Sequence, residues 1–146
     1  MPTVIDDATL LAVLTRRAGP HLLSDAAAGS VLTTGTWYYR LHRALHDPAS
    51  TGSLSTMVAA LSSSAQNQLL TALDDLPPEI VVPGPRVLVP VMGALRLRRR
   101  VNHLSAEALA TALISAATIR VAVETALLRD ACADLGIQLQ VRSPFT

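Results

Sequence analysis

Three acidic residues stand where segments of expected secondary structure begin or end. Asp6 follows a short β-prone run, Glu107 lies in the first turn of an alanine-rich helix, and Glu124 follows a β-branched run. Carboxylate oxygens are the ligands that Mg²⁺ and Mn²⁺ prefer, and such an ion activates water and stabilises charge in phosphoryl transfer. The three acids are therefore the residues to consider for a shared site, provided that the fold brings them to one cleft.

The same acids also have a structural explanation. Asp6 or its neighbour Asp7 can cap the first helix, a role that aspartate fills often. Acids in a first helical turn, such as Glu107 and Glu124, are favoured by the helix dipole whatever the function. The metal-site hypothesis requires the three carboxylates to converge, whereas capping does not.

Short apolar strands alternate with helix-length segments along the chain. Connections of this length require parallel strands with helices on both faces. We therefore predict the α/β class: a three-layer α/β/α fold with a mostly parallel sheet, built as a single domain over residues 1–146. Strands are expected at 3–5, 30–34, 79–82, 119–123 and 137–141.

The predicted helices fill the segments between these strands. The helix around residues 10–14 is expected to end at Arg16-Arg17-Ala18-Gly19-Pro20. Pro90 marks either an irregular segment or the first turn of a helix that reaches Arg100. The other helices are expected at 37–45, closed by His46-Asp47-Pro48, and at 54–61, 65–73, 105–117 and 125–135, the last with Gly136 as its left-handed cap.

Bulk properties limit the class of protein. The formal net charge is +1, too small for general attraction to nucleic acid, so any RNA contact must be local. Cys132 is the single cysteine, which agrees with a reducing cytoplasm. No apolar run approaches about 18 residues, so a soluble cytoplasmic protein without a membrane span is expected. The composition is 50% hydrophobic, which favours a homodimer.

The order of several motifs resembles the PIN domain family, which includes the VapC-type toxins of bacterial toxin-antitoxin pairs. The segment 4–14 is similar to the family's opening strand, aspartate and leucine-rich helix. Leu104-Ser105-Ala106-Glu107-Ala108-Leu109 resembles its Ser-x-Asp-Ala-Leu segment, with Glu for Asp. The segment 121–128 resembles the late strand and Thr-x-Asp-x-x-Leu turn, again with Glu for Asp at position 124. The segment 131–137 resembles the final helix, glycine and edge strand.

This resemblance implies a metal-dependent ribonuclease that uses Mg²⁺ or Mn²⁺, with Asp6, Glu107 and Glu124 as its catalytic and metal-binding residues. It also implies RNA and an antitoxin-like protein as partners. One feature of the family pattern is missing. A helix-borne glutamate is expected between Trp37 and Arg40, but this stretch contains no acid, and Tyr39 or Arg40 takes its place. An arginine there would repel a metal ion and form a salt bridge with Asp6 or Glu107. We therefore expect a degenerate site with weak or no catalysis and a role in binding nucleic acid or a protein partner.

Two alternatives stay open at the level of the sequence. The first is an active Mg²⁺- or Mn²⁺-dependent endoribonuclease toxin of a toxin-antitoxin pair. The second is a purely structural or oligomer-forming module. The basic cluster is either a contact for RNA or an acidic partner, or a solvated helix end; it comprises Arg96, Arg98, Arg99 and Arg100.

Two further groups of residues are predicted to be structural. His42 and His46 are four apart on a helix, as metal ligands can be, but no acid partner is evident in the sequence, and an exposed helix face explains them. Trp37-Tyr38-Tyr39 contains most of the aromatic side chains and is expected to pack in the core or in a dimer interface.

Overall fold

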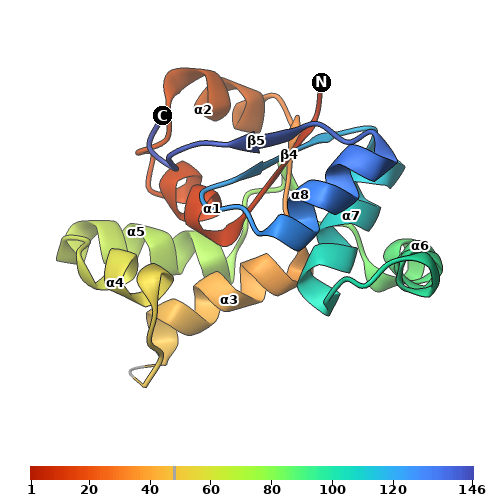
Figure 1. Cartoon of the computed structure of the whole chain (residues 1–146). Coiled ribbons are helices and arrows are strands. Elements are labelled where there is room, and N and C mark those ends of the chain that lie inside the picture. The colour runs from red at the N-terminus through yellow and green to blue at the C-terminus, as the bar shows by residue number, and fades with distance from the viewer. Residues whose placement is uncertain (48) are drawn as a thin grey trace.

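A computed structural model describes residues 1–47 and 49–146, and these residues form eight helices and one five-stranded sheet (Figure 1). The strand order is β3-β2-β1-β4-β5, and every neighbouring pair is parallel. The predicted α/β class with a parallel sheet is confirmed. The strands are β1 (Thr3–Ile5), β2 (Val31–Leu32), β3 (Ile80–Val81), β4 (Thr118–Val121) and β5 (Leu139–Val141).

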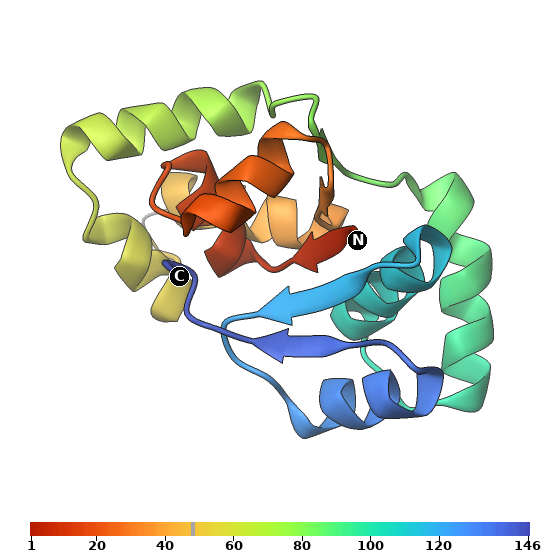
Figure 2. The ribbon, with the colours of Figure 1, turned by 90° about the horizontal axis from the view of Figure 1, so that it is seen from above.

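Alternating side chains of the central strands enter two separate cores, one on each face of the sheet. Val4 and Ile119 pack with α6, α7 and α8 on one face, whereas Ile5 and Val31 pack with α1, α2, α3, α4 and α5 on the other. Because successive strand residues point to opposite faces, a run such as Val4-Ile5 is apolar on both sides. The result is a three-layer arrangement with helices on both sides of the strands (Figure 2).

Most helices occur where the sequence predicted them. The predicted left-handed cap is confirmed, since Gly136 has φ +69°. Pro48, the last residue of the expected stop after the 37–45 helix, lies outside the described residues. The bounds are α1 (Asp7–Leu14), α2 (Pro20–Ala27), α3 (Gly35–His46), α4 (Ser53–Ala59), α5 (Ser63–Asp74), α6 (Pro85–Arg98), α7 (His103–Ser115) and α8 (Ala126–Leu135).

The helix α2 was not predicted, α6 begins before the predicted position, and several other helix ends differ from the prediction by about two residues. Pro20 does not mark the end of a helix. It begins α2, because proline at a first helical position loses no hydrogen bond. The same rule places the start of α6 at Pro85, so Pro90 lies inside that helix. The Asn102 side chain accepts from the Ser105 N–H and starts α7 two residues early, so Glu107 lies beyond its first turn.

The parallel sheet creates a natural place for a site. The chain first adds β2 and β3 on one side of β1 and then returns to add β4 and β5 on the other. The carboxyl ends of β1 and β4 therefore flank the point where the strand order switches, where doubly wound folds carry their ligands. None of the helices in the described residues is long and apolar enough to cross a membrane.

Candidate functional site

A cavity of about 270 Å³ opens at the carboxyl edge of the sheet, between the ends of β1 and β4. Asp6 and Asp7 line it from the turn between β1 and α1, and Arg40 lines it from α3. The helix-capping residues Asn102 of α7 and Thr125 of α8 complete the wall. The amino ends of α1, α7 and α8 therefore border the cavity, and their partial positive charge favours an anion there.

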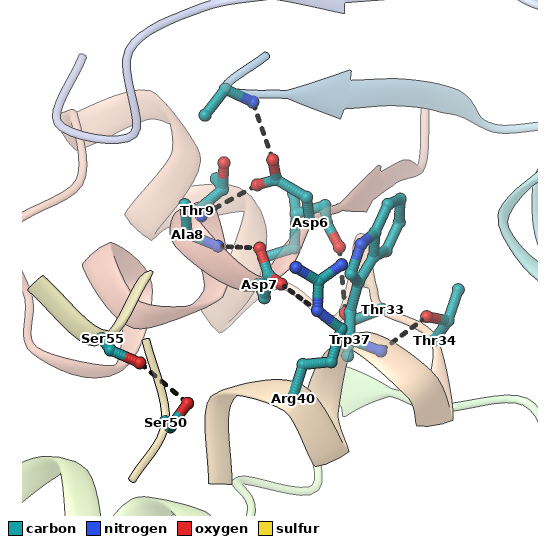
Figure 3. Close-up of polar contacts among 12 residues, drawn as sticks. Asp6, Asp7, Ala8, Thr9, Thr33, Thr34, Trp37, Arg40, Ser50 and Ser55 are labelled. Carbon is teal, nitrogen blue, oxygen red and sulfur yellow. Dashed lines mark hydrogen bonds and ion pairs between the residues drawn. The ribbon is translucent and has the colours of Figure 1, made fainter. Parts of the chain in front are cut away.

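Both carboxylate oxygens of Asp6 are occupied by backbone donors (Figure 3). Oδ1 accepts from the Thr9 N–H at 2.9 Å, which caps α1, and Oδ2 accepts from the Ala122 N–H at 2.7 Å, directly after β4. The side chain is 7% exposed. Asp6 thus ties the turn after β1 to the turn after β4, and the predicted capping role is confirmed.

Asp7 is the acid with an unused oxygen. Its Oδ1 accepts from the Ala8 N–H at 2.8 Å. Arg40 Nε lies 3.3 Å from its Oδ2, an ion pair without hydrogen-bond geometry, so this buried oxygen accepts no hydrogen bond from the described residues. Burial raises the pKa of the Asp7 carboxyl, the Arg40 guanidinium opposes this rise, and the Asp6 carboxylate adds to it.

The raised pKa of Asp7 gives a testable pH dependence. Protonation of a carboxyl whose folded pKa is raised stabilises the fold below the unfolded value of 3.8, and this stabilisation is lost as pH rises through the folded pKa. Asparagine keeps an acceptor for Ala8 and carries no charge. We expect the unfolding free energy of Asp7→Asn, relative to the wild type, to increase from about pH 3 to about pH 7. Urea denaturation at several pH values measures it.

The exposed carboxyl of Asp25 on α2 supplies the control for this series. Asp25→Asn removes one exposed carboxyl and shows how much of the change with pH comes from the loss of a surface charge. A difference for Asp7→Asn that stays flat or falls with pH would contradict the assignment of a raised pKa.

Glu107 lies on α7, but its carboxylate accepts hydrogen bonds from the amino end of α3. Its Oε1 accepts from the Thr36 N–H at 3.3 Å, and its Oε2 accepts from the Thr36 hydroxyl. His103 Nε2 lies 3.6 Å from Oε2 on the same helix. A buried carboxylate at the amino end of α3 is stabilised by the helix dipole, so Glu107 holds α3 against α7.

The third predicted acid stands apart from these contacts. Glu124 Oε1 lies 3.5 Å from Arg129 Nη1, and the Glu124 side chain is 37% exposed. Neither Glu124 nor Glu107 lines the cavity that contains Asp6. In residues 1–47 and 49–146, the three acids do not form a group whose ligand atoms all lie within 4.8 Å of one another.

Arg40 occupies the position predicted to lack an acid. Its ion-pair partner is Asp7 and not, as was predicted, Asp6 or Glu107. Arg40 lies beside Asp7 and Trp37 in Figure 3, and its side chain is half exposed. Tyr39, the other residue considered for that position, is 64% exposed. Trp37 is buried in the core, as predicted, and Tyr38 packs against the opposite core cluster.

The basic cluster is partly engaged with the protein itself. Arg99 Nη1 lies 2.6 Å from Asp134 Oδ2 of α8. Arg96, Arg98 and Arg100 are exposed. Arg98, Arg99 and Arg100 border a shallow hollow against α8, the helix whose amino end also lines the Asp6 cavity. The cluster therefore leaves three arginines available to an anionic partner near that edge.

Three observations correct or extend the prediction from the sequence. The histidine pair does have an acid partner, because Asp74 of α5 lies 3.7 Å from His42. Arg120, which the sequence analysis did not single out, is buried on β4, and its Nη2 donates to the Ser143 and Thr146 carbonyls at 3.2 Å. Cys132 is buried, and burial raises the pKa of its thiol to about 11, so it is no nucleophile.

Comparison of the chain with protein-family models and with curated proteins finds no match. The function of the chain is therefore inferred from the geometry of the carboxyl edge.

Proposed function

We propose that this chain is a PIN-like domain with a degenerate acidic site, which cleaves RNA weakly or not at all and binds single-stranded RNA at the carboxyl edge of its sheet. The observation that carries the proposal is the ion pair between Arg40 and Asp7 inside the cavity. A fixed cation beside the free oxygen of Asp7 disfavours a metal ion there and favours a phosphate group.

The contacts of Asp6 and Glu107 also support a degenerate site. Asp6 uses both oxygens on backbone N–H groups, and Glu107 uses both on Thr36. A metal ion at these oxygens would share them with buried hydrogen bonds, and the loss of any one of these bonds would leave an unsatisfied donor at a cost of about 1–3 kcal/mol. The acids hold segments of the fold together. The cavity at the carboxyl edge of the sheet is bordered by helix amino ends that attract phosphate.

Exposed cations extend this edge toward a longer anionic ligand. Arg96 and Arg98 lie in the last turn of α6, and Arg100 lies between α6 and α7, whose capping residue Asn102 lines the cavity. One phosphate at Arg40 and further phosphates along Arg98 and Arg100 match a short single strand better than a compact small molecule. An antitoxin-like protein and a homodimer, the other partners expected from the sequence, are further proposals for the same surface.

RNA binding is tested with a labelled single-stranded RNA and fluorescence anisotropy in EDTA. Arg40→Met should raise the dissociation constant about fivefold to tenfold, since one charge-assisted phosphate contact is lost. The slope of log K against log salt concentration should fall by about 1. Arg43→Met is the matched control, because Arg43 lies one turn along α3, pairs with Asp47 and does not line the cavity.

An active endoribonuclease toxin is the competing function, favoured by one observation. Asp6 and Asp7 are adjacent, and Asp7 Oδ2 is free of hydrogen bonds among the described residues. Mg²⁺ commonly takes only one or two protein carboxylates and keeps its waters. Robust RNA cleavage that requires Mg²⁺ or Mn²⁺ and stops in EDTA would establish this alternative. Absence of both cleavage and RNA binding would leave a protein partner or a structural module.

A further inference from the structure

We propose that His42, His46 and Asp74 form a binding site for one first-row divalent transition metal ion, with Zn²⁺ as its best fit. The three side chains come from the carboxyl ends of α3 and α5. They are the one group of three histidine, cysteine or acidic residues in residues 1–47 and 49–146 whose ligand atoms all lie within 4.8 Å of one another. The site is separate from the Asp6 cavity and independent of the proposed RNA binding.

The spacing of the two histidines suits a shared ion. Residues four apart on a helix lie one above the other on the same face, and the ring centroids of His42 and His46 are 4.3 Å apart. Asp74 Oδ1 lies 3.7 Å from His42 Nε2. Ligand atoms about 2.0–2.1 Å from a tetrahedral zinc ion are about 3.4 Å from one another, so small side-chain rotations close the set.

The two helices that carry the ligands are held together beneath the site. Leu41 of α3 packs in one buried cluster with Leu69 and Leu73 of α5. The Tyr38 hydroxyl, one turn before His42, donates to the carbonyl of Leu73, the residue before Asp74. Ligands on rigid, packed helices lose little freedom when they bind an ion, and this favours affinity.

The local charge also favours a cation. α3 ends at His46 and α5 ends at Asp74, and the last carbonyls of a helix carry partial negative charge. The nearest basic side chain on α3, Arg43, is turned to Asp47, with Nε 3.5 Å from Oδ2. Asp75 adds a second carboxylate directly after Asp74.

The donor set identifies the class of ion. Two imidazoles and one carboxylate suit Zn²⁺ and its neighbours, whereas Mg²⁺ takes oxygen ligands and keeps its water. Three protein ligands leave the fourth position of a tetrahedral ion open to water or to a side chain of a partner. The bound ion would fasten the end of α3, the helix that carries Arg40, to α5.

The proposal is tested by isothermal titration of the chelator-treated chain with Zn²⁺ at pH 7.5. The wild type should bind with 1:1 stoichiometry, and Co²⁺ should give the visible absorption of a four-coordinate ion. His46→Ala and Asp74→Asn should each weaken binding by at least about tenfold. With Zn²⁺ at about 100 times its dissociation constant, the melting temperature of the wild type should rise by about 5–10 °C.

His21→Ala is the matched control, because His21 is an exposed helix residue on α2. It should bind Zn²⁺ like the wild type, and Mg²⁺ should leave every melting temperature unchanged. All the substituted side chains are at least partly exposed, so circular dichroism should show folded variants. No saturable Zn²⁺ binding by the wild type, or equal binding by His46→Ala, would overturn the site and leave His42 and Asp74 as an ion pair only.

Discussion

Replacing Asp6 with alanine is expected to lower the free energy of unfolding by about 2–4 kcal/mol. The substitution removes a helix cap from the Thr9 N–H and at the same time removes the acceptor of the Ala122 N–H. The Asp6 side chain is buried, so water does not readily replace the lost acceptor. The two losses also separate the turn after β1 from the turn after β4, the two segments that flank the cavity.

Chemical denaturation with urea measures this effect as a shift of the midpoint at constant slope. Asp6→Asn keeps one acceptor oxygen but presents an amide N–H₂ group to the second donor, so about half of the loss should remain. Asp25→Ala, on the exposed face of α2, should change the unfolding free energy by less than about 0.5 kcal/mol. An Asp6→Ala protein as stable as the wild type would show that Asp6 is not a structural tie.

This role for Asp6 changes how an activity assay must be read. Loss of RNA binding or cleavage in Asp6→Ala would follow from a disordered cavity as readily as from a lost ligand. Arg40→Met is the sharper test of the site, because Arg40 is half exposed and forms one ion pair with Asp7. Asp7 itself is buried, so removal of Arg40 leaves its carboxylate without a cation, and circular dichroism at the pH of the binding assay must show that Arg40→Met is folded.

The layers of the fold could be predicted from the sequence because each depends on a local pattern. Continuous apolar runs such as Val4-Ile5 require burial on both faces, and helix-length connections require parallel pairing. The largest errors concern helix starts: Pro20 begins a helix where the end of one was expected, and the starts of α6 at Pro85 and of α7 after Asn102 were missed. Proline is compatible with either role, and the apolar pattern around it does not decide between them.

The site could be predicted only in part because its contacts join distant segments. The position of Asp6 at a strand end was predicted, since it depends on one adjacent strand. The pairs Arg40 with Asp7 and Glu107 with Thr36 depend on how α3 crosses α1 and α7. No residue spacing in the sequence fixes that crossing. For the same reason, Asp74 could not be predicted as a partner of His42. It lies on α5 and reaches His42 only after the two helices pack.

Replacing Glu107 with alanine should lower the free energy of unfolding by about 2–3 kcal/mol. The variant leaves the Thr36 N–H and hydroxyl without their acceptor and removes a negative charge from the amino end of α3. Glu107→Gln keeps an acceptor without the charge and should lose about 1–2 kcal/mol. Glu124→Ala is the control, since it removes a half-exposed ion pair with Arg129 and should cost less than about 1 kcal/mol.

The sign of this effect separates the two hypotheses for the acids. Carboxylates assembled to hold a metal repel one another in the metal-free protein, so removing any one of them should raise stability in EDTA. A carboxylate that serves as a helix cap acts in the opposite direction, because its loss leaves donors unsatisfied. A stabilised Glu107→Ala protein in EDTA, destabilised relative to the wild type when Mn²⁺ is added, would therefore favour the active ribonuclease. A loss of stability that is the same with and without Mn²⁺ would assign Glu107 to the attachment of α3 to α7.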